Sequence, residues 1–377
     1  MHIIGLIAEY NPFHNGHLYQ INKIKEKYPD SIIIAVVSSS FTQRGDVSII
    51  DKWTKTQIAL DNNIDVVVEL PFVYATQSSD IFAKGAIEIL NHLKIETLVF
   101  GTESTKLDQI SIVADLELYN PEYNNLVKQY LKEGINYPTA TNKAILALNG
   151  KKISTPNDLL ALSYIKELKK QNLNITPVNI VRTNNYHSLS SEGNISSATA
   201  IRNKNLKNEK IDNLIPYNPN KIKKISMNNY YSYLKYKILS EGIEIKKYNT
   251  LEEGIENKIT KEIINANNYK ELITKIKTKR YTYNKISRML LHILTNFTKE
   301  EAQNIKIDYV RILGFNKNGQ KYLNKIKKEV KLPLLTGYQK NISKILDIEL
   351  RVSKIYSLSN ESNLIKKEYD KKPIIKM

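Results

Sequence analysis

Two histidines three positions apart carry the clearest chemical signal in this sequence of 377 residues. His14 and His17 lie on either side of Gly16, in a segment that joins a predicted strand at Ile3–Ala8 to a predicted helix. The amino terminus of a helix presents unpaired N–H groups and a positive dipole to an anion. We therefore expect both imidazoles to donate to phosphoryl oxygens and Gly16 to let a phosphate approach closely. The alternative is that the two histidines only cap backbone groups of the loop.

A hydroxyl-rich segment near residue 200 predicts a second phosphate site. Ser196, Ser197 and Thr199 stand at the start of a predicted helix, and Arg202 follows in the same segment. Hydroxyls in the first turn of a helix can donate to an anion, and a guanidinium can hold the outer phosphates of a nucleoside triphosphate. The alternative is an ordinary serine or threonine cap without a ligand.

The loop at residues 38–46 follows the second predicted strand, so we expect it to face the same crevice. Its Arg44 could hold a carboxylate in its planar fork or steady an α-phosphate, and Lys52 lies close enough in sequence to assist. The alternative is a solvated loop with a turn. Glu9 and Asp46 could reach a magnesium ion through water. The remaining carboxylates and histidines are too scattered to predict a metal site built by the protein itself.

Short runs of β-branched residues alternate with helical patterns through the first half of the chain. The runs are too short for helices and lack the alternation of a half-solvated strand, so they predict buried parallel strands. Strands and helices that alternate with right-handed crossovers predict an α/β fold with a doubly wound parallel sheet, whose ligands bind in loops beyond the carboxyl ends of the strands. The predicted strands are Ile3–Ala8, Ser31–Val37, Val66–Leu70, Thr97–Phe100 and Ile175–Val181.

Positive charge is concentrated in the second half of the chain. Residues 1–200 contain 18 basic and 20 acidic side chains, whereas residues 201–377 contain 38 and 18, a net charge of +20. Such a surface binds phosphate backbones by releasing counterions, which favours a nucleic acid as the partner. A coding bias towards lysine in AT-rich DNA is the alternative, but it does not explain the break in charge.

The basic half has mostly helical patterns. The predicted elements are helices at Tyr230–Leu239, Thr250–Asn267, Tyr269–Phe297 and Gln320–Glu329 and short strands at Val310–Gly314 and Leu332–Leu335. The two short strands and the helix between them predict a small α/β element inside this half. We therefore predict a nucleotide-binding catalytic domain at residues 1–205 and a basic, mostly helical RNA-binding domain at residues 206–377. The tyrosines at 230–233 either stack on bases or pack inside their own domain.

Composition excludes several classes of protein. The sequence contains no cysteine, which excludes disulfides, thiolate metal sites and cysteine nucleophiles. A hydrophobic content of 41% is enough for buried cores and excludes a wholly disordered chain. The longest aliphatic runs are far shorter than a membrane helix requires, and the first residues do not resemble a signal peptide. We expect a cytoplasmic protein without a membrane partner.

The segment around the histidines resembles a known superfamily. HNGH at His14–His17 is similar to the HxGH signature of the nucleotidyltransferases, which include cytidylyltransferases and class I aminoacyl-tRNA synthetases. The longer string EYNPFHNGHLY at 9–19 resembles the bacterial tRNA(Met) cytidine acetate ligase family. ISSATAIR at 195–202 resembles the ISSTxIR phosphate-binding element of the superfamily, with Ala198 where serine or threonine is common. The resemblance extends over nearly the whole chain and includes FTQRG at 41–45.

This resemblance implies an HxGH nucleotidyltransferase-like fold with a basic, mainly helical C-terminal domain. It further implies an enzyme that uses ATP, with Mg²⁺, to convert acetate to acetyl-adenylate and pyrophosphate, and that passes the acetyl group to N4 of the wobble cytidine of elongator tRNA(Met). Two other functions remain open: a small-molecule adenylyltransferase, and a non-catalytic RNA-binding protein regulated by a nucleotide. The implied catalytic residues are His14, His17, Arg44, Ser197 and Arg202. The implied ATP-binding residues are Ile7, Ala8, Glu9, Tyr10, Asn11, Pro12, Phe13, His14, Asn15, Gly16, His17, Leu18, Tyr19, Gln20, Gly101, Asn157 and Arg182.

Overall fold

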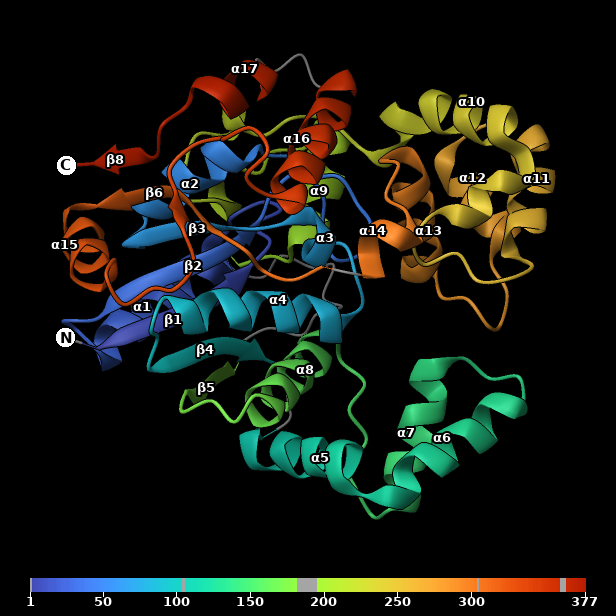
Figure 1. Cartoon of the computed structure of the whole chain (residues 1–377), viewed down its shortest axis with the longest axis horizontal. Coiled ribbons are helices and arrows are strands. Elements are labelled where there is room, and N and C mark those ends of the chain that lie inside the picture. Colours follow the sequence, from blue (N-terminus) through green and yellow to red (C-terminus); the bar gives the residue numbers. More distant parts are fainter. Residues whose placement is uncertain (1, 104–105, 182–194, 304, 360–363) are drawn as a thin grey trace.

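The predicted strands assemble into one sheet (Figure 1). The structure is a computed structural model that describes residues 2–103, 106–181, 195–303, 305–359 and 364–377. Within these residues eight strands are joined in the order β5-β4-β1-β2-β3-β6-β7, and β8 also pairs with β6. The strands are β1 (Ile3–Ala8), β2 (Ile32–Ser38), β3 (Val66–Leu70), β4 (Thr97–Thr102), β5 (Thr176–Val181), β6 (Val310–Asn316), β7 (Leu334–Leu335) and β8 (Ile374–Lys376). Strands β1 to β5 run parallel, which confirms the doubly wound parallel sheet.

Helices connect the strands and cover the sheet. Every residue of β2 and β3 is buried, and because neighbouring side chains point to opposite faces, both faces must be covered. The helices up to residue 206 are α1 (Asn15–Lys27), α2 (Lys52–Asp61), α3 (Phe72–Ala75), α4 (Ser79–His92), α5 (Leu107–Tyr119), α6 (Pro121–Lys132), α7 (Tyr137–Ala147), α8 (Pro156–Lys170) and α9 (Ala198–Leu206).

The basic half contributes the remaining helices. They are α10 (Tyr231–Glu241), α11 (Ile255–Asn265), α12 (Tyr269–Ile276), α13 (Tyr283–Leu294), α14 (Lys299–Gln303), α15 (Lys317–Ile326), α16 (Lys344–Tyr356) and α17 (Leu364–Asp370). Short 3₁₀ turns lie at Asp212–Leu214, Pro219–Lys221, Met227–Tyr230, Gly242–Lys247 and Ser357–Ser359. In the part of the chain that the structure describes, no helix combines the length and the apolar character that crossing a bilayer requires.

Helices α10 to α13 form a group at the side of the molecule away from both chain ends (Figure 1). Two tyrosines of this group, Tyr230 and Tyr231, are buried, and their hydroxyls donate to the carbonyls of Tyr356 and Ala266. Packing inside the domain therefore explains these two side chains. Tyr233, at the end of the same cluster, is 43% exposed.

The helix predicted at Tyr269–Phe297 is two helices. The first, α12, ends at Ile276, and the second, α13, begins at Tyr283. Thr282 is the N-cap of α13, and its hydroxyl oxygen accepts a hydrogen bond from the Lys285 N–H at 3.4 Å. A threonine inside a long helical pattern is a weak signal, because threonine also occurs within helices.

The strands near the carboxyl terminus do not form a separate α/β element. β6 pairs antiparallel with β3, with Val66 opposite Phe315, and β8 runs parallel to β6. The predicted strand–helix–strand element is present as β6, α15 and β7, with β6 and β7 paired in parallel, but it joins the sheet of the first half through β3. The pattern of a short strand does not reveal its partner, since pairing joins residues far apart in the chain.

Candidate active site

The candidate residues gather beyond the carboxyl ends of β1, β2 and β4. β1 lies between β4 and β2, so the chain continues from β1 towards one side of the sheet and later returns to build the other. Such a switch point leaves a crevice between the loops that follow the strands, and ligands of doubly wound sheets bind there. The segment from Glu9 to His14 leaves β1 at this point, and α1 begins at Asn15.

His14 and His17 form a stacked pair at the start of α1. Their ring centroids are 3.8 Å apart and the ring planes are inclined by 25°. His14 Nδ1 accepts a hydrogen bond from the Gly16 N–H at 3.0 Å, and His17 Nδ1 accepts one from the His14 N–H at 3.2 Å. A neutral imidazole that accepts at Nδ1 carries its proton at Nε2, so this geometry assigns the tautomer of both rings. Capping and anion binding therefore use different nitrogens and are compatible.

Packing against the histidine ring explains the glycine between them. A Cβ on Gly16 would lie 2.9 Å from Cε1 and 3.0 Å from Nδ1 of His14, and 3.7 Å from Cγ2 of Ile195. The ring itself thus requires glycine, whether or not a phosphate approaches there. Tyr10 and Phe13 lie beneath the pair: both rings are buried, and their centroids are 4.9 and 5.5 Å from that of His17.

The second predicted phosphate segment meets the first. Ser197 is the N-cap of α9, and its hydroxyl oxygen accepts from the Ala200 N–H at 3.2 Å. Ser197 therefore caps the helix, and its hydroxyl can in addition donate its proton to a ligand. Arg202 Nη1 donates to the Asn11 carbonyl at 2.7 Å, and Nη2 donates to Thr199 Oγ1 at 3.2 Å. These contacts bring the amino ends of α1 and α9 together.

The loop that carries Arg44 is tied to both segments. The Gln43 N–H donates to Glu9 Oε1 at 2.7 Å, and Asp46 Oδ2 lies 3.7 Å from Arg202 Nε. Burial raises the pKa of Asp46, and the charges of Arg202 and Arg44 partly oppose that rise. Arg44 is half-buried and close enough to Asp46 to act on its charge. Arg44 and Arg202 thus both lie within electrostatic reach of Asp46.

Helix α13 of the basic half clamps the tip of this loop. Ser287 Oγ donates to the Gly45 carbonyl at 2.9 Å, and Arg288 Nη1 donates to the Gln43 carbonyl at 3.1 Å. Gly45 has a φ of 75°, and a Cβ on it would lie 2.6 Å from the Arg288 backbone nitrogen. Only glycine suits both conditions. Sequence reasoning missed this contact, because the pattern of an amphipathic helix does not indicate which distant residues its serine and arginine side chains contact.

Two of the three remaining ATP-binding predictions lie at the end of β4. Gly101 is the second-last residue of that strand, and Asn157 lies in the first turn of α8. Asn157 Nδ2 donates to Glu103 Oε1 at 2.7 Å, which ties the start of α8 to the end of β4. The third residue, Arg182, lies outside the described residues.

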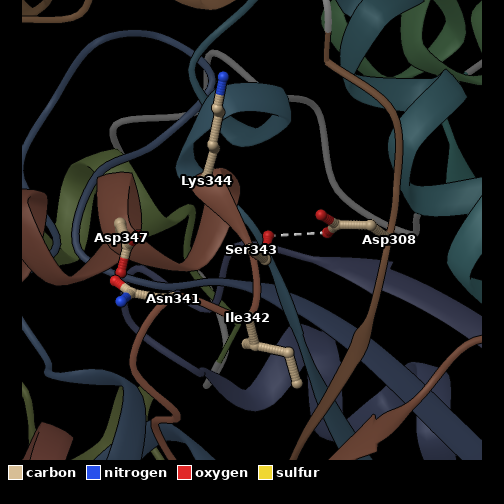
Figure 2. A pocket seen from close by; sticks show the side chains of 6 residues that line it. All are labelled: Asp308, Asn341, Ile342, Ser343, Lys344 and Asp347. Carbon is tan, nitrogen blue, oxygen red and sulfur yellow. Dashed lines mark hydrogen bonds between the residues drawn. The ribbon is translucent and has the colours of Figure 1, made fainter.

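Within the described residues, no group of three or more His, Asp or Glu side chains is arranged to hold a metal ion. A polar hollow of about 420 Å³ does lie at the start of α16 (Figure 2). Its lining is Asp308, Asn341, Ile342, Ser343, Lys344 and Asp347. Ser343 Oγ accepts from the Ile345 N–H at 3.1 Å and donates to Asp308 Oδ1 at 2.8 Å, as the dashed line shows. This hollow contains none of the predicted site residues, and Ser343 serves as a helix cap.

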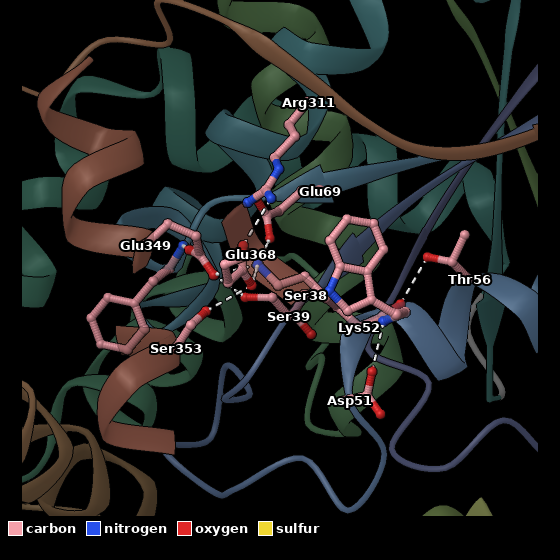
Figure 3. A network of polar contacts seen from close by, with 12 residues as sticks. Ser38, Ser39, Asp51, Lys52, Thr56, Glu69, Arg311, Glu349, Ser353 and Glu368 are labelled. Atoms are coloured by element: carbon pink, nitrogen blue, oxygen red, sulfur yellow. Dashed lines mark hydrogen bonds and ion pairs between the residues drawn. The ribbon is translucent and has the colours of Figure 1, made fainter. Parts of the chain in front are cut away.

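Lys52 belongs to a buried cluster of charges (Figure 3). Its Nζ contacts the carboxylates of Glu69 on β3 and of Glu368 on α17, the latter at 2.7 Å. Arg311 of β6 contacts the same two carboxylates at 3.2 and 2.8 Å, and Glu349 of α16 lies 3.5 Å from Lys52. The Lys52 side chain is 0% exposed. The prediction that Lys52 assists at a phosphate is therefore wrong: it fixes the C-terminal helices to the sheet.

Burial and the neighbouring charges shift the pKa values of two carboxylates in this cluster in opposite directions. Burial and the neighbouring Glu69 raise the pKa of Glu349 to about 7. Burial acts in the same direction on Glu368, but Lys52 and Arg311 outweigh it and lower the pKa of Glu368 to about 2. Three carboxylates face two cations, so a proton on Glu349 leaves the cluster neutral. Neutrality is the favourable state for charges removed from water.

Lys55, one turn further along α2, reaches the edge of the crevice. Its Nζ donates to the carbonyls of Ser38 and Ser39, at 2.8 and 3.1 Å, where β2 ends. Burial lowers the pKa of Lys55 to about 7, while the Glu9 carboxylate acts in the opposite direction. Sequence reasoning missed Lys55, because a lysine on a helix is usually exposed.

The sheet order and the site at its switch point define the class of protein: an α/β nucleotidyl transferase with paired histidines at the first helix. The family described as HIGH Nucleotidyl Transferase matches residues 1–372.

Similar proteins narrow this class. Proteins named tRNA(Met) cytidine acetate ligase from Clostridium tetani and Clostridium kluyveri are 36% and 37% identical to the chain over 403 and 404 residues, and the alignments cover at least 99% of each chain. Crystal structures of Thermotoga maritima TmcAL, one apo and one bound with alpha-thio ATP, match with TM-scores of 0.91 and 0.89. Both T. maritima chains are 28% identical in sequence to this chain, and each alignment covers 100% of this chain and 99% of the T. maritima chain. The chain belongs to the tRNA(Met) cytidine acetate ligase family.

Proposed function

We propose that the chain is an ATP-dependent ligase that acetylates N4 of the wobble cytidine of elongator tRNA(Met). The observation that carries this proposal is the full-length similarity to tRNA(Met) cytidine acetate ligases, which includes both the histidine site and the basic half. The reaction consumes acetate and ATP and releases AMP and pyrophosphate. We assign it to the cytoplasm, where bacterial tRNA is found.

The first step is adenylation of acetate. An acetate oxygen attacks the α-phosphorus, the bond to the β-phosphate oxygen breaks, and pyrophosphate leaves. In such a transfer the protein mainly positions groups and neutralises charge that develops on phosphoryl oxygens. The Nε2–H groups of His14 and His17 would supply two of these donors. Their stacking and their fixed tautomers support this role, because the donors need no reorientation during the reaction.

The departing pyrophosphate would be held at the amino end of α9. Ser197 can donate its hydroxyl proton while its oxygen caps the helix. Arg202 donates to Asn11 and Thr199, and its guanidinium, which carries five N–H donors, would also contact the pyrophosphate oxygens. Arg44, which also acts on the charge of Asp46, would hold the acetate carboxylate or the α-phosphate.

The rest of the nucleotide would lie along the end of β1 and the end of β4. Residues 7–20, Gly101, Asn157 and Arg182 are the ATP-binding residues of this proposal. The T. maritima relative bound with alpha-thio ATP supports a nucleotide in this fold. Mg²⁺ would enter as MgATP, held mainly by phosphate oxygens and water, since such ions usually need only one or two carboxylates from the protein. Glu9 and Asp46, the carboxylates of the two loops at the crevice, would reach such an ion through water.

The second step moves the acetyl group to RNA. The cytidine N4 attacks the carbonyl carbon of acetyl-adenylate, the carbon–oxygen bond to AMP breaks, and N4 loses a proton. A mixed anhydride is reactive enough for this weak nucleophile, and a crevice that excludes water would protect it. The basic residues of 206–377 would bind the phosphates of the tRNA.

Labelled acetate tests the proposal. The protein is incubated with ¹⁴C-acetate, ATP, Mg²⁺ and total bacterial tRNA, and the tRNA is digested to nucleosides. We expect the label in N4-acetylcytidine and in elongator tRNA(Met) alone. Pyrophosphate release without label in tRNA would contradict the second step, and no acetate-dependent pyrophosphate release would contradict the first.

A further inference from the structure

The connection between α12 and α13 is a basic, exposed segment. Residues 277–284 read Lys-Thr-Lys-Arg-Tyr-Thr-Tyr-Asn, and all of them except Tyr281 are exposed. In the described part of the chain, no carboxylate pairs with Lys277 or Lys279. Arg280 lies 3.4 Å from Glu252, but its side chain remains 68% exposed. The segment therefore carries three cations whose charge is available to a partner.

This segment lies next to the loop of the candidate active site. Tyr283 opens α13, and the next turn of that helix clamps the loop through Ser287 and Arg288. Burial and then the charge of Asp46 raise the pKa of Tyr283, which places this side chain within electrostatic reach of Asp46. Asp46 in turn lies 3.7 Å from Arg202. The hydrogen bonds of Ser287 and Arg288 thus connect the helix that follows the segment to the loop that carries Asp46, next to the proposed pyrophosphate site.

An exposed aromatic ring also belongs to the segment. Tyr283 is 45% exposed, although it stands in the first turn of a helix whose other face is buried. Lysine and arginine beside an exposed aromatic ring are the combination with which proteins bind unpaired RNA, since cations bind phosphates and rings stack on bases.

We propose that residues 277–284 bind the single-stranded RNA next to the target cytidine, with the three cations on its phosphates and Tyr283 stacked on a base. This inference rests on the proposed function and assigns a surface to its RNA substrate. An anticodon loop suits this surface, because its bases are unstacked and can be splayed onto a protein.

A second basic surface serves as the comparison. Lys317, Lys321 and Lys325 recur once per turn along α15 and are exposed. A Cβ on Gly319 of the same helix would lie 2.1 Å from the carbonyl oxygen of Asp65, the residue just before β3. α15 therefore lies at the amino ends of the parallel strands, whereas the candidate site lies beyond their carboxyl ends. Figure 1 shows α15 and α13 at opposite sides of the molecule.

Two triple variants with equal loss of charge test the inference. The first is Lys277→Gln/Lys279→Gln/Arg280→Gln, and the control is Lys317→Gln/Lys321→Gln/Lys325→Gln. The readouts are the Kd for total tRNA, the KM for tRNA in acetylation, and acetate-dependent ATP–pyrophosphate exchange. We expect the first variant to raise Kd and KM by about tenfold or more and to lower the salt dependence of log Kd by about two units, because fewer cations then neutralise RNA phosphates. The control should shift both constants by less than about twofold.

Single variants at Tyr283 test stacking separately. Tyr283→Ala should raise the KM for tRNA by roughly tenfold, the usual cost of removing one base–aromatic stack. Tyr283→Phe should restore the wild-type value, because it keeps the ring. Pyrophosphate exchange should stay at the wild-type rate in both variants and in both triple variants, which also shows that they are folded.

The outcomes separate this inference from the proposed function. Equal effects of the two triple variants, or no effect of either, would overturn the inference even if the wild type acetylates tRNA. A wild type that binds tRNA through residues 277–284 without acetylating it would support the surface and overturn the proposed function. A wild type that does not bind tRNA would overturn both.

Discussion

The paired histidines cap backbone groups through one nitrogen of each ring, and the proposed function assigns phosphate binding to the other nitrogen. Nδ1 of each ring accepts a backbone N–H, which holds the stack in place, and Nε2 carries the proton. Donors fixed in this way stabilise developing charge without the cost of reorganisation that water would incur. The structural role of the pair therefore supports its catalytic role.

Replacing His17 by alanine tests the proposed phosphate binding. His17→Ala should slow acetyl-adenylate formation by about 10²–10³-fold, the usual effect of removing one preorganised donor. Acetate-dependent ATP–pyrophosphate exchange measures this rate. Affinity for tRNA, measured by filter binding, should remain close to that of the wild type, because the proposal assigns His17 to ATP and not to RNA.

His92 offers a matched control for the same change. It is half-exposed in the last turn of α4, at the amino end of β4 and thus away from the candidate site. His92→Ala should keep wild-type exchange and tRNA binding. If His17→Ala loses exchange and tRNA affinity to the same extent, the assignment of His17 to the nucleotide step is wrong.

The buried charge cluster predicts unequal effects of two substitutions. Lys52→Met leaves three carboxylates with Arg311 as their one cation within the cluster, so it should lower the free energy of unfolding by about 3–5 kcal/mol. Glu349→Gln mimics the protonated acid that a pKa of about 7 makes accessible, so it should cost about 1 kcal/mol or less.

Urea denaturation at pH 7 measures both variants of the cluster. Lys23→Met is the control, because Lys23 forms an exposed pair with Glu26 and its loss should leave the midpoint unchanged. A cost for Glu349→Gln as large as that for Lys52→Met would show that the ionised form of Glu349 is the stabilising one.

At the scale of elements, His292 links α13 to the segment after α3. The ring is 0% exposed, Nε2 lies 3.1 Å from Thr76 Oγ1, and Nδ1 lies 3.1 Å from Thr250 Oγ1. Burial lowers the pKa of His292 to about 4, mainly because the charged form loses its hydration. His292 is therefore a hydrogen-bonded histidine of the core.

This buried histidine predicts a loss of stability in mild acid. Since its pKa in the folded chain is about 4 against 6.5 for the ordinary value, the unfolded chain binds the proton first as pH falls. The stabilisation is present above pH 6.5 and disappears between pH 6.5 and 4. Between pH 7 and pH 5 the wild type should therefore lose about 2 kcal/mol more than His292→Gln. Urea titrations at the two pH values measure this, and equal losses in both proteins would refute it.

Local patterns predicted most elements, and long-range contacts account for the failures. The runs at Ile3–Ala8 and Val66–Leu70 match β1 and β3 residue for residue, because a short run of β-branched residues strongly favours a buried strand. The partner of β6 was missed, because pairing depends on distant residues. The break between α12 and α13 was missed as well, since it rests on one threonine cap.

The candidate site shows the same division between local and distant information. The sequence pattern was sufficient to predict His14, His17 and Ser197 as site residues, because each lies at the start of a predicted helix. The role predicted for Lys52 was wrong, and Lys55 was not predicted at all. The residues next to a lysine in sequence do not indicate whether its ammonium group is buried. The clamp of α13 on Gly45 likewise joins two segments that the sequence keeps apart.

At the scale of the whole molecule, the two halves share a sheet but differ in charge. β6 and β8 attach the C-terminal segment to β3, while α13 contacts the loop at the candidate site. The basic half is therefore attached both to the sheet and to the loop at the candidate site.

The charge difference predicts that salt affects only one of the two steps. If about six phosphates are bound, raising salt from about 50 to 200 mM should weaken tRNA binding on the order of 10³-fold. The KM for tRNA in acetylation should rise accordingly, whereas acetate-dependent pyrophosphate exchange should change little. Parallel losses of both activities would indicate that salt acts on folding or on ATP binding instead.

The most direct test of the central claim is a crystal structure of the protein with alpha-thio ATP and Mg²⁺. The account predicts the triphosphate between the amino ends of α1 and α9, with phosphoryl oxygens within hydrogen-bond distance of Nε2 of both His14 and His17 and of the Arg202 guanidinium. A nucleotide bound elsewhere on the chain, or bound there with its phosphates directed away from both imidazoles, would contradict it.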